Sequence, residues 1–418
     1  MTKSEIIVGI DVGTSLTKIA VGKYLRDDKT PSIIALGIAP SEGVKRGVVT
    51  DIQDATKSIG IALETASKMI EDDIKEVYVS LNGSHINSIP TSGKAAVSRA
   101  DGEVTSDDVA RVIANSNPGP SSPNKDIIDI IPKTYILDEE TGIKNPEGMN
   151  GIRLELEAII VEGTSSCIKN LEKCIHNLGL SINSEEIGII SASNSVLTKK
   201  QKDLGVAVID MGAGTTSVAV YEEGHLIHIV VIPIGANHIT NDLAIGLRTS
   251  IEVAEKVKLK YGIALEKSLG EDAKLKIDLS KINSEEVGVF PLSYVASIIE
   301  ARLKEIFGLV KQELKNIERD GLLPAGIVLV GGGANLKMIL ELAKQELKLP
   351  TKIGIPQGVE GSIADVDNPI YANLVGLVKG GFEHTDDFNI HSHSGQKNKV
   401  ASKVTNPFKS LLKLVFPD

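Results

Sequence analysis

The chain has 418 residues, of which 42% are hydrophobic and 24% charged, with a formal net charge of −10. These values fit two to three globular domains or one duplicated fold, and they exclude a disordered, collagen-like or coiled-coil chain. The acidic balance, the 3% aromatic content and the lack of Trp argue against nucleic acid as a partner. Cys167 and Cys174 are too few for a disulfide framework or a zinc site, and we interpret both as buried packing thiols in a reducing cytosol.

The N-terminal segment predicts neither a signal peptide nor a membrane span, because it has no charged leader before a long apolar core. Two apolar runs, Ile6–Ile10 and Leu16–Val21, flank a glycine-containing turn and predict a β-hairpin. The pattern returns near the middle of the chain, where IDMGAGTTSVAV aligns with IDVGTSLTKIAV and places Asp210 over Asp11. Two such units, half a chain apart, predict two related halves that face each other.

Apolar residues with helical spacing follow the hairpins, and they predict helices over Ile52–Ile70, Cys167–Leu178, Ala236–Tyr261 and Pro291–Glu318. Helices between strand pairs indicate layered α/β halves. Residues 84–165 are predicted to be an insertion, with a helix start at Thr105–Asp108. Residues 382–404 are polar and predict a flexible linker, in which His391 and His393 are interpreted as solvated residues rather than metal ligands.

Three glycine turns carry the functional prediction. The first consists of Gly13, Thr14 and Ser15 after Asp11, with Lys18 close enough in the hairpin to reach a terminal phosphate; the second consists of Gly212, Ala213, Gly214, Thr215 and Thr216 after Asp210. Glycine lets backbone N–H groups approach phosphate oxygens, so two such turns could hold a triphosphate between them. Asp11 and Asp210 would face that charge, which is unfavourable unless Mg²⁺ lies between, directly or through water.

The third turn is Gly331, Gly332, Gly333 and Ala334. It follows a predicted strand, Ile327–Val330, and is expected to open a helix, Asn335–Leu347, whose N-terminus suits an anion or a planar ring. The chain has no GxxxxGK[ST] sequence, and GAGTTS lacks the third glycine of the dinucleotide fingerprint. The prediction of a phosphate-binding site therefore rests on the order and spacing of the three turns.

In that order the turns resemble the two phosphate motifs and the adenosine motif of the actin/DnaK/sugar-kinase superfamily. Within it the chain resembles the FtsA family of bacterial cell-division proteins, through KRGVVTDIQDATKSI, GIKNPEGMNGIRLELE and the segment 233–262. The resemblance implies an actin-like ATPase fold with two ribonuclease-H-like halves, an inserted subdomain and a C-terminal amphipathic helix. It divides the chain into subdomain IA (1–83 and 166–197), IC (84–165), IIA (198–235 and 308–381, with a return to IA), IIB (236–307), linker (382–404) and amphipathic helix (405–418).

The resemblance also implies ligands and partners. The stretch AEKVK matches a family motif in which Glu255 approaches the ribose and Lys258 the adenine of ATP. Arg302 matches an arginine at the groove for the C-terminal peptide of the ring protein FtsZ, although it could be a surface residue beside Glu300 and Glu305. Self-association into filaments, contact of subdomain IC with other division proteins and a place on the inner face of the membrane at the septum are implied as well.

One departure from the superfamily pattern bears on hydrolysis. Related ATPases often carry Gln, Glu or Asp before the segment that is SASNSVL here, and this position falls at Gly188, with Glu185 and Glu186 just before it. Loss of a water-orienting group can cost orders of magnitude in rate. We therefore expect ATP binding with slow or undetectable turnover.

The last 14 or so residues predict an amphipathic helix after Asn406 and Pro407. Its predicted membrane-binding residues are Phe408, Lys409, Leu411, Leu412, Lys413, Val415 and Phe416. Apolar residues opposite lysines are typical of a helix that lies in the interface of anionic lipids, and the alternative is a helix that docks on the protein itself. Two other functions stay open from the residues: a small-molecule kinase of the same superfamily, and a scaffold related to the pilus-assembly protein PilM.

Overall fold

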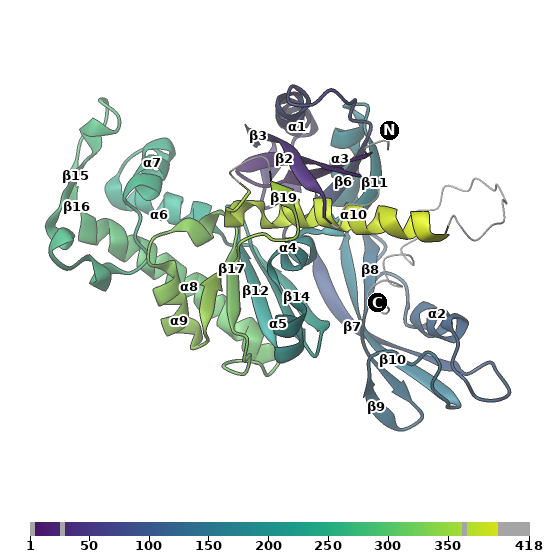
Figure 1. Ribbon diagram of the computed structural model, residues 1–418. Coiled ribbons are helices and arrows are strands. Elements are labelled where there is room, and N and C mark those ends of the chain that lie inside the picture. Colours follow the sequence, from purple (N-terminus) through teal and green to yellow (C-terminus); the bar gives the residue numbers. More distant parts are fainter. Residues whose placement is uncertain (1–4, 26–29, 362–365, 392–418) are drawn as a thin grey trace.

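The computed structural model describes residues 5–25, 30–361 and 366–391 (Figure 1). Within these ranges, no helix has both the length and the apolar character that crossing a bilayer requires. The predicted amphipathic helix, 405–418, and His393 lie outside the described residues.

The architecture consists of two α/β halves, each built on its own sheet. The first sheet has the order β11 (Ser181–Ile187), β6 (Glu76–Leu81), β1 (Glu5–Val12), β2 (Leu16–Tyr24), β3 (Ser32–Pro40), β19 (Glu360–Gly361). The second has the order β14 (His225–Ile232), β13 (Thr216–Glu222), β12 (Val206–Met211), β17 (Ile327–Val330), β18 (Thr351–Ile353). Small ribbons are formed by β4 (Val44–Lys45) with β5 (Val48–Val49), and by β15 (Lys276–Asp278) with β16 (Val289–Pro291).

The two sheets repeat each other strand by strand. β1 pairs antiparallel with β2 and parallel with β6, and β12 pairs in the same way with β13 and β17. The two predicted hairpins are therefore confirmed, and so is their alignment, because Asp11 lies opposite Lys18 in one hairpin and Asp210 opposite Ser217 in the other. The prediction of two related halves is correct.

The predicted insertion is a separate sheet with one helix. Its strands have the order β7 (Asn87–Ala96), β10 (Arg153–Thr164), β8 (Lys125–Leu137), β9 (Glu140–Ile143), and α2 (Ser106–Asn115) packs on it. The helix begins where the sequence predicts, since Thr105 and Asp108 cap it reciprocally. A small core of its own, which includes Val112, Tyr135 and Leu156, holds this unit together, and Figure 1 shows it extending away from the two halves.

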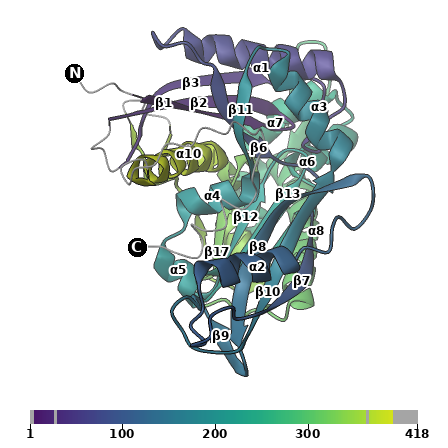
Figure 2. The same cartoon turned by 90° about the vertical axis from the view of Figure 1, so that its right-hand side faces the viewer.

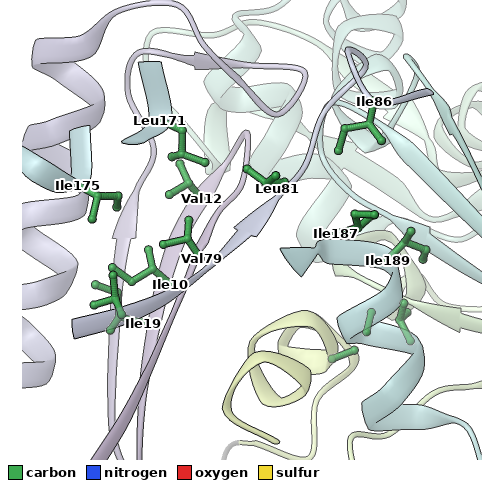
Figure 3. Packing of buried hydrophobic residues seen from close by; sticks show 14 of the residues in the cluster. Ile10, Val12, Ile19, Val79, Leu81, Ile86, Leu171, Ile175, Ile187 and Ile189 are labelled. Atoms are coloured by element: carbon green, nitrogen blue, oxygen red, sulfur yellow. The ribbon is translucent and has the colours of Figure 1, made fainter. Parts of the chain in front are cut away.

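The first half is covered by helices on both faces of its sheet. On one face lie α1 (Ile52–Ser67) and α3 (Ser165–His176); on the other lie α4 (Gly188–Val196) and α10 (Ala372–His391) (Figure 2). Ile10 and Val79 of the sheet share one buried cluster with Leu171 and Ile175 of α3 (Figure 3). Cys174 is buried in this cluster as predicted, whereas Cys167 is only half-buried, so it is less enclosed than predicted.

The second half carries α5 (Lys199–Leu204), α6 (Ala236–Leu247), α7 (Ile251–Tyr261), α8 (Leu292–Asn316) and α9 (Ile339–Leu347), with short 3-10 turns at Glu266–Lys274, Leu279–Lys281, Gly332–Asn335 and Pro369–Tyr371. The prediction of a single helix over 236–261 is wrong. The backbone of Arg248 is in the left-handed conformation and ends α6, and Ser250 caps the start of α7. The helix predicted from Asn335 begins only at Ile339, after the left-handed Met338.

Helix α10 crosses the molecule between the halves (Figure 1). Its buried residues include Leu374, Leu377 and Val378, which pack against Ile7 and Tyr24 of the first sheet. The helix is described as far as His391, so the range predicted as a flexible linker from residue 382 is helical in its described part. Phe382 is a core residue, 6% exposed, and its ring stands edge-on to Tyr24 at 5.0 Å between centroids.

Candidate functional site

The two predicted phosphate turns close in the same way. The N–H of Gly13 donates to the carbonyl of Leu16 over 3.1 Å, and the N–H of Gly212 donates to that of Thr215 over 3.0 Å. A Cβ at either glycine would press on the same carbonyl, at 2.9 Å and 3.1 Å respectively. Glycine therefore keeps each turn tight, and both turns line the space between the halves.

The turns meet across that space. A Cβ at Gly214 would lie 2.6 Å from the hydroxyl of Thr14 and 2.9 Å from the Cα of Arg46, both in the first half. Thr14 is held by the N–H of Gly47, which donates to its hydroxyl over 2.8 Å. At this point the lack of a side chain at Gly214 lets the turn of the second half lie directly against Thr14 and Arg46.

Asp11 is saturated by protein donors. Its Oδ1 accepts hydrogen bonds from Ser80 (2.8 Å), Asn82 (2.9 Å) and Asn373 (2.8 Å), and its Oδ2 lies 2.7 Å from Nζ of Lys18. The same ammonium donates to the carbonyl of Ile370 over 2.7 Å. Lys18 therefore lies in the cleft, but its charge is already balanced by Asp11.

Asp210 has a different environment. Burial, with a contribution from the charge of Asp11, raises its pKa to about 6, and Lys18 opposes this shift. Within the described residues, no hydrogen bond or ion pair engages its carboxylate. Gly331, at φ 82°, passes so close that a Cβ there would lie 2.2 Å from Oδ1 of Asp210. Only glycine can bring the third turn against the end of β12 in this way.

The two aspartates that were predicted to bind Mg²⁺ differ in whether their carboxylate oxygens are free to do so. Both oxygens of Asp11 are occupied, whereas Asp210 is available to hold the ion, directly or through water. The described residues contain no cluster of three His, Cys, Asp or Glu that could bind a metal alone. A magnesium ion here would need nucleotide phosphates and water as most of its ligands, which is how this ion is usually bound.

Glu255 and Lys258 form an ion pair on α7, with 2.6 Å between Oε2 and Nζ. Lys258 is only 6% exposed, and its ammonium also donates to the hydroxyl of Thr240 over 2.8 Å. Glu255 is more open and faces the cavity beside Leu336. The pair therefore borders the end of the cleft near the third turn, with Lys258 fully engaged by the protein.

The three turns and α7 enclose one cavity of about 680 Å³, a usual size for a small-molecule site. The predicted residues that line it are Asp11, Gly13, Thr14, Ser15, Lys18, Asp210, Gly212, Ala213, Gly214, Thr215, Glu255, Lys258, Gly331, Gly332 and Gly333. Two predicted residues do not line the cavity. Thr216 is buried and its hydroxyl donates a hydrogen bond to the carbonyl of Ile234, and Ala334 is buried in the core. The sequence prediction missed Asn82, Asn237, Ser217, Lys337 and Asn373.

Gly188 begins α4 beside Asn82 and Asn373, which line this cavity. A Cβ there would lie 2.0 Å from Oδ1 of Asn82 and 2.7 Å from Nδ2 of Asn373. Glu185 and Glu186 do not face the cleft; they line a separate cavity of about 610 Å³ with Lys202 and Lys379. Burial raises the pKa of each of these glutamates to about 7.

Arg302 lies on α8, outside the cleft. Its guanidinium donates to both carboxylate oxygens of Asp242, at 2.6 Å and 2.9 Å, and to Glu305 at 2.5 Å. Glu300 instead pairs with Lys304. The seven predicted membrane-binding residues, from Phe408 to Phe416, lie outside the described part of the chain.

The repeated sheets, the inserted subdomain and the cleft between facing glycine turns define an actin-like protein. Solved structures support this fold: the PilM–PilN pilus biogenesis complex has a TM-score of 0.64 over 90% of this chain and 98% of that one, at 15% identity. MreB5 of Spiroplasma citri, bound to ADP, has a TM-score of 0.54 over 93% and 99%, at 16% identity.

Sequence relatives give the particular family. The cell division protein FtsA of Pseudomonas aeruginosa is 34% identical to this chain, over 94% of this chain and 93% of its own length. The FtsA protein of Bacillus subtilis is 37% identical, over 79% of this chain and 74% of its own length. A family model described as cell division protein FtsA matches residues 207–376, and one for the SHS2 domain inserted in FtsA matches 83–162. The chain belongs to the FtsA family of cell division proteins.

Proposed function

We propose that this chain binds ATP with Mg²⁺ in the cleft between its halves, and that the closed form assembles into actin-like filaments. The observation that carries the proposal is the meeting of two repeated glycine turns across a cavity of about 680 Å³, with Lys18 on one side and Asp210 on the other. Mg²⁺ would supply charge neutralisation between the phosphates and Asp210. The backbone N–H groups of both turns would hold the phosphates, and Glu255 would face the ribose.

Calorimetric titration of the purified chain with ATP, ADP and GTP, each with and without Mg²⁺, tests the binding. We expect ATP and ADP to bind in the micromolar range and ATP to require Mg²⁺. An absence of heat at millimolar nucleotide would refute the proposal. Electron microscopy of the same samples tests assembly, with filaments expected in ATP and none in the nucleotide-free sample.

The C-terminal segment would attach these filaments to the inner face of the membrane. Residues 397–418 contain five lysines and one Asp, against a net charge of −10 for the whole chain. One partly inserted amphipathic helix contributes about 4 kcal/mol, which is a dissociation constant on the order of 1 mM. Filaments would bind firmly because linked subunits raise the effective concentration of each helix.

Sedimentation with vesicles that contain anionic lipid compares the full chain with residues 1–404. The full chain should pellet with vesicles in ATP, and the truncated chain should stay in the supernatant. Vesicles of neutral lipid are the control for the role of the lysines. Equal pelleting of both chains would contradict the proposed attachment.

The C-terminal peptide of FtsZ is the proposed partner at α8. Arg302 offers a guanidinium that is 23% exposed and already arranged for carboxylates by Asp242, so a peptide carboxylate could take over part of this pairing. We expect Arg302→Ala to weaken peptide binding about tenfold. Arg319→Ala is a matched control, because Arg319 forms a comparable pair with Glu222 in the other part of the second half. Equal affinities of the two variants would exclude this site.

A further inference from the structure

A second cavity, of about 610 Å³, lies where the two halves and the inserted subdomain meet. Its walls come from the end of β11, from α5, from β8 and from one side of α10. Ile128, Ile187, Ile190 and Leu197 make part of these walls apolar. Acidic residues outnumber lysines in the lining, so the cavity combines apolar walls with an excess of carboxylates.

Glu185 provides a carboxylate that the protein leaves uncommitted. It is half-buried on the edge strand β11 and lines the cavity, and no hydrogen bond or ion pair among the described residues engages it. Only its Oε1 is fully enclosed, so Oε2 is the oxygen that a group in the cavity can contact. The neighbouring Glu186 accepts a hydrogen bond from Ser191 at Oε2, but its enclosed Oε1 has no partner in the described part of the chain.

The lysines of the cavity do not balance these carboxylates. Nζ of Lys202 donates to Oδ1 of Asn194 over 2.8 Å, and Nζ of Lys379 donates to the carbonyl of the same residue over 3.0 Å. Within the described ranges, no ion pair joins either lysine to Glu185 or Glu186. Burial raises the pKa of each glutamate to about 7, as expected for a carboxylate that lacks a paired cation.

A cation on an apolar stem fits this arrangement. A lysine side chain has such a stem and ends in a compact ammonium group. The stem would pack against the apolar walls, and the ammonium would reach Oε2 of Glu185. A partly buried carboxylate that gains a hydrogen-bonded cation recovers part of the free energy that it lost when it left water.

The C-terminal segment of the chain can supply this lysine. Lys379 and Glu383 of α10 line the cavity, and the described helix continues to His391, about 12 Å beyond Glu383. A chain from His391 to Lys403 spans up to about 40 Å when extended, which is more than the return to the cavity requires. Residues 397–418 contain five lysines and one Asp, so their charge is complementary to that of the cavity.

We propose that the C-terminal segment, residues 397–418, docks at this cavity of its own chain, with the ammonium of one of its lysines on the carboxylate of Glu185. Docking and the proposed membrane attachment use the same segment, so a docked segment is held away from lipid. Anionic lipid releases it by competing for the lysines. This competition rests on the proposed attachment, whereas the docking itself does not depend on it.

Carbodiimide coupling of the full chain tests the docking, because this reagent joins a carboxyl group to an ammonium group only where the two are in contact. After digestion, mass spectrometry should find Glu185 linked to a lysine of residues 397–418. The yield should stay constant when the protein is diluted tenfold before coupling. Coupling of Glu185 to Lys202 or Lys379 alone would overturn the proposal. A yield that falls with dilution would overturn it as well, since the segment would then belong to another copy of the chain.

Limited digestion with trypsin, which cuts after lysine, tests the part played by Glu185. A docked segment is cut only when it is released, so Glu185→Gln should be cut within residues 397–418 about threefold faster than wild type. Glu64→Gln is the matched control, because Glu64 is exposed on α1 and pairs with Lys68, and it should be cut at the wild-type rate. Equal rates for wild type and Glu185→Gln would contradict the docking. Should Glu185→Gln not fold, as judged by thermal unfolding, the coupling of the wild-type chain decides.

Sedimentation with anionic vesicles tests the competition separately. Glu185→Gln should need about threefold less lipid than wild type for half-maximal pelleting, and Glu64→Gln should match wild type. Equal pelleting of wild type and Glu185→Gln would refute the competition. If none of the three chains pellets, the proposed membrane attachment fails, and the carbodiimide links still decide whether the segment docks.

Discussion

Gly188 begins a helix at a place where a side chain has no room. Its Cβ would overlap the amides of Asn82 and Asn373, which are fixed by Asp11. We expect Gly188→Ala to lower the free energy of unfolding by about 1–3 kcal/mol, because overpacking forces fixed groups apart. Thermal unfolding measures the effect.

Gly308→Ala is the control for this prediction. Gly308 lies in the middle of α8, and nothing lies within 4 Å of a Cβ placed there. Alanine at such a site raises helix stability by about 0.5–1 kcal/mol. A Gly188→Ala chain as stable as Gly308→Ala would show that the amides move aside without cost.

Glu186 makes folding stability depend on pH. Burial is the main cause that raises its pKa from 4.5 to about 7, with Glu383 and Asp129 adding to the shift and a hydrogen bond from Ser191 opposing it. The folded chain therefore holds this proton more tightly than the unfolded chain. The stabilisation from this group is complete below the unfolded pKa of 4.5 and is lost as the pH rises through about 7.

Melting temperatures across this window should show the effect. From about pH 5 to about pH 8 the wild-type chain should lose more stability than Glu186→Gln, which cannot ionise. Glu64→Gln is the control, since Glu64 is exposed and Lys68 lowers its pKa, so it titrates below the window. Parallel curves for wild type and Glu186→Gln would contradict the assignment.

Among single residues, sequence predicted those that belong to local turns. The Asp-x-Gly turns could be predicted from the sequence because residues adjacent in the chain determine the geometry of a turn. Asn373 could not be predicted, since it reaches Asp11 across 362 positions of the chain. Asn82 had a weak signal, a polar residue directly after the buried strand β6, and only the pairing of β6 with β1 brings it to Asp11.

At the scale of elements, the two hairpins, β17 and the helices α1, α3 and α8 followed from the sequence pattern, and two of the errors fell at residues with a left-handed backbone. Arg248 divides the predicted helix over 236–261, and Met338 delays α9. Neither residue type favours a positive φ, so tertiary packing imposes these breaks. The continuation of α10 past residue 382 depends on Phe382 packing against Tyr24, a contact that a polar composition does not reveal.

The cap of α2 contributes to the stability of the inserted subdomain. The hydroxyl of Thr105 accepts from the N–H of Asp108, and Asp108 Oδ2 accepts from the N–H of Thr105. Thr105→Ala should cost about 1 kcal/mol, and Thr105→Ser should cost less because it keeps the hydroxyl. Hydrogen exchange of residues 106–115 measures local opening, and equal exchange in both variants would refute the role of the cap.

At the scale of the whole molecule, the approach of the two halves depends on Gly214. A methyl group there would meet Thr14 and Arg46 in the first half, whereas a methyl group at Gly212 would meet only its own turn. We expect Gly214→Ala to reduce the stabilisation by Mg-ATP more than Gly212→Ala does. For wild type this stabilisation is about 2.7 kcal/mol at a nucleotide concentration 100 times the Kd.

Differential scanning calorimetry with and without nucleotide measures these shifts. Without nucleotide both variants should melt close to wild type, since the halves can separate slightly. A larger loss for Gly212→Ala than for Gly214→Ala would indicate that the shape of the turn, and not the approach of the halves, limits binding.

The two repeated hairpins differ in the residue that lies opposite their shared aspartate. Lys18 stands opposite Asp11 and cancels its charge, while the matching position opposite Asp210 holds the uncharged Ser217. A scaffold with identical residues on both sides would accept a polyphosphate in either of two reversed orientations. Here the strand pairing of the two hairpins repeats and the charge opposite the aspartate does not, so the proposed polyphosphate would bind in one preferred orientation. Lys18 would then set the direction in which each copy of the chain binds its proposed nucleotide.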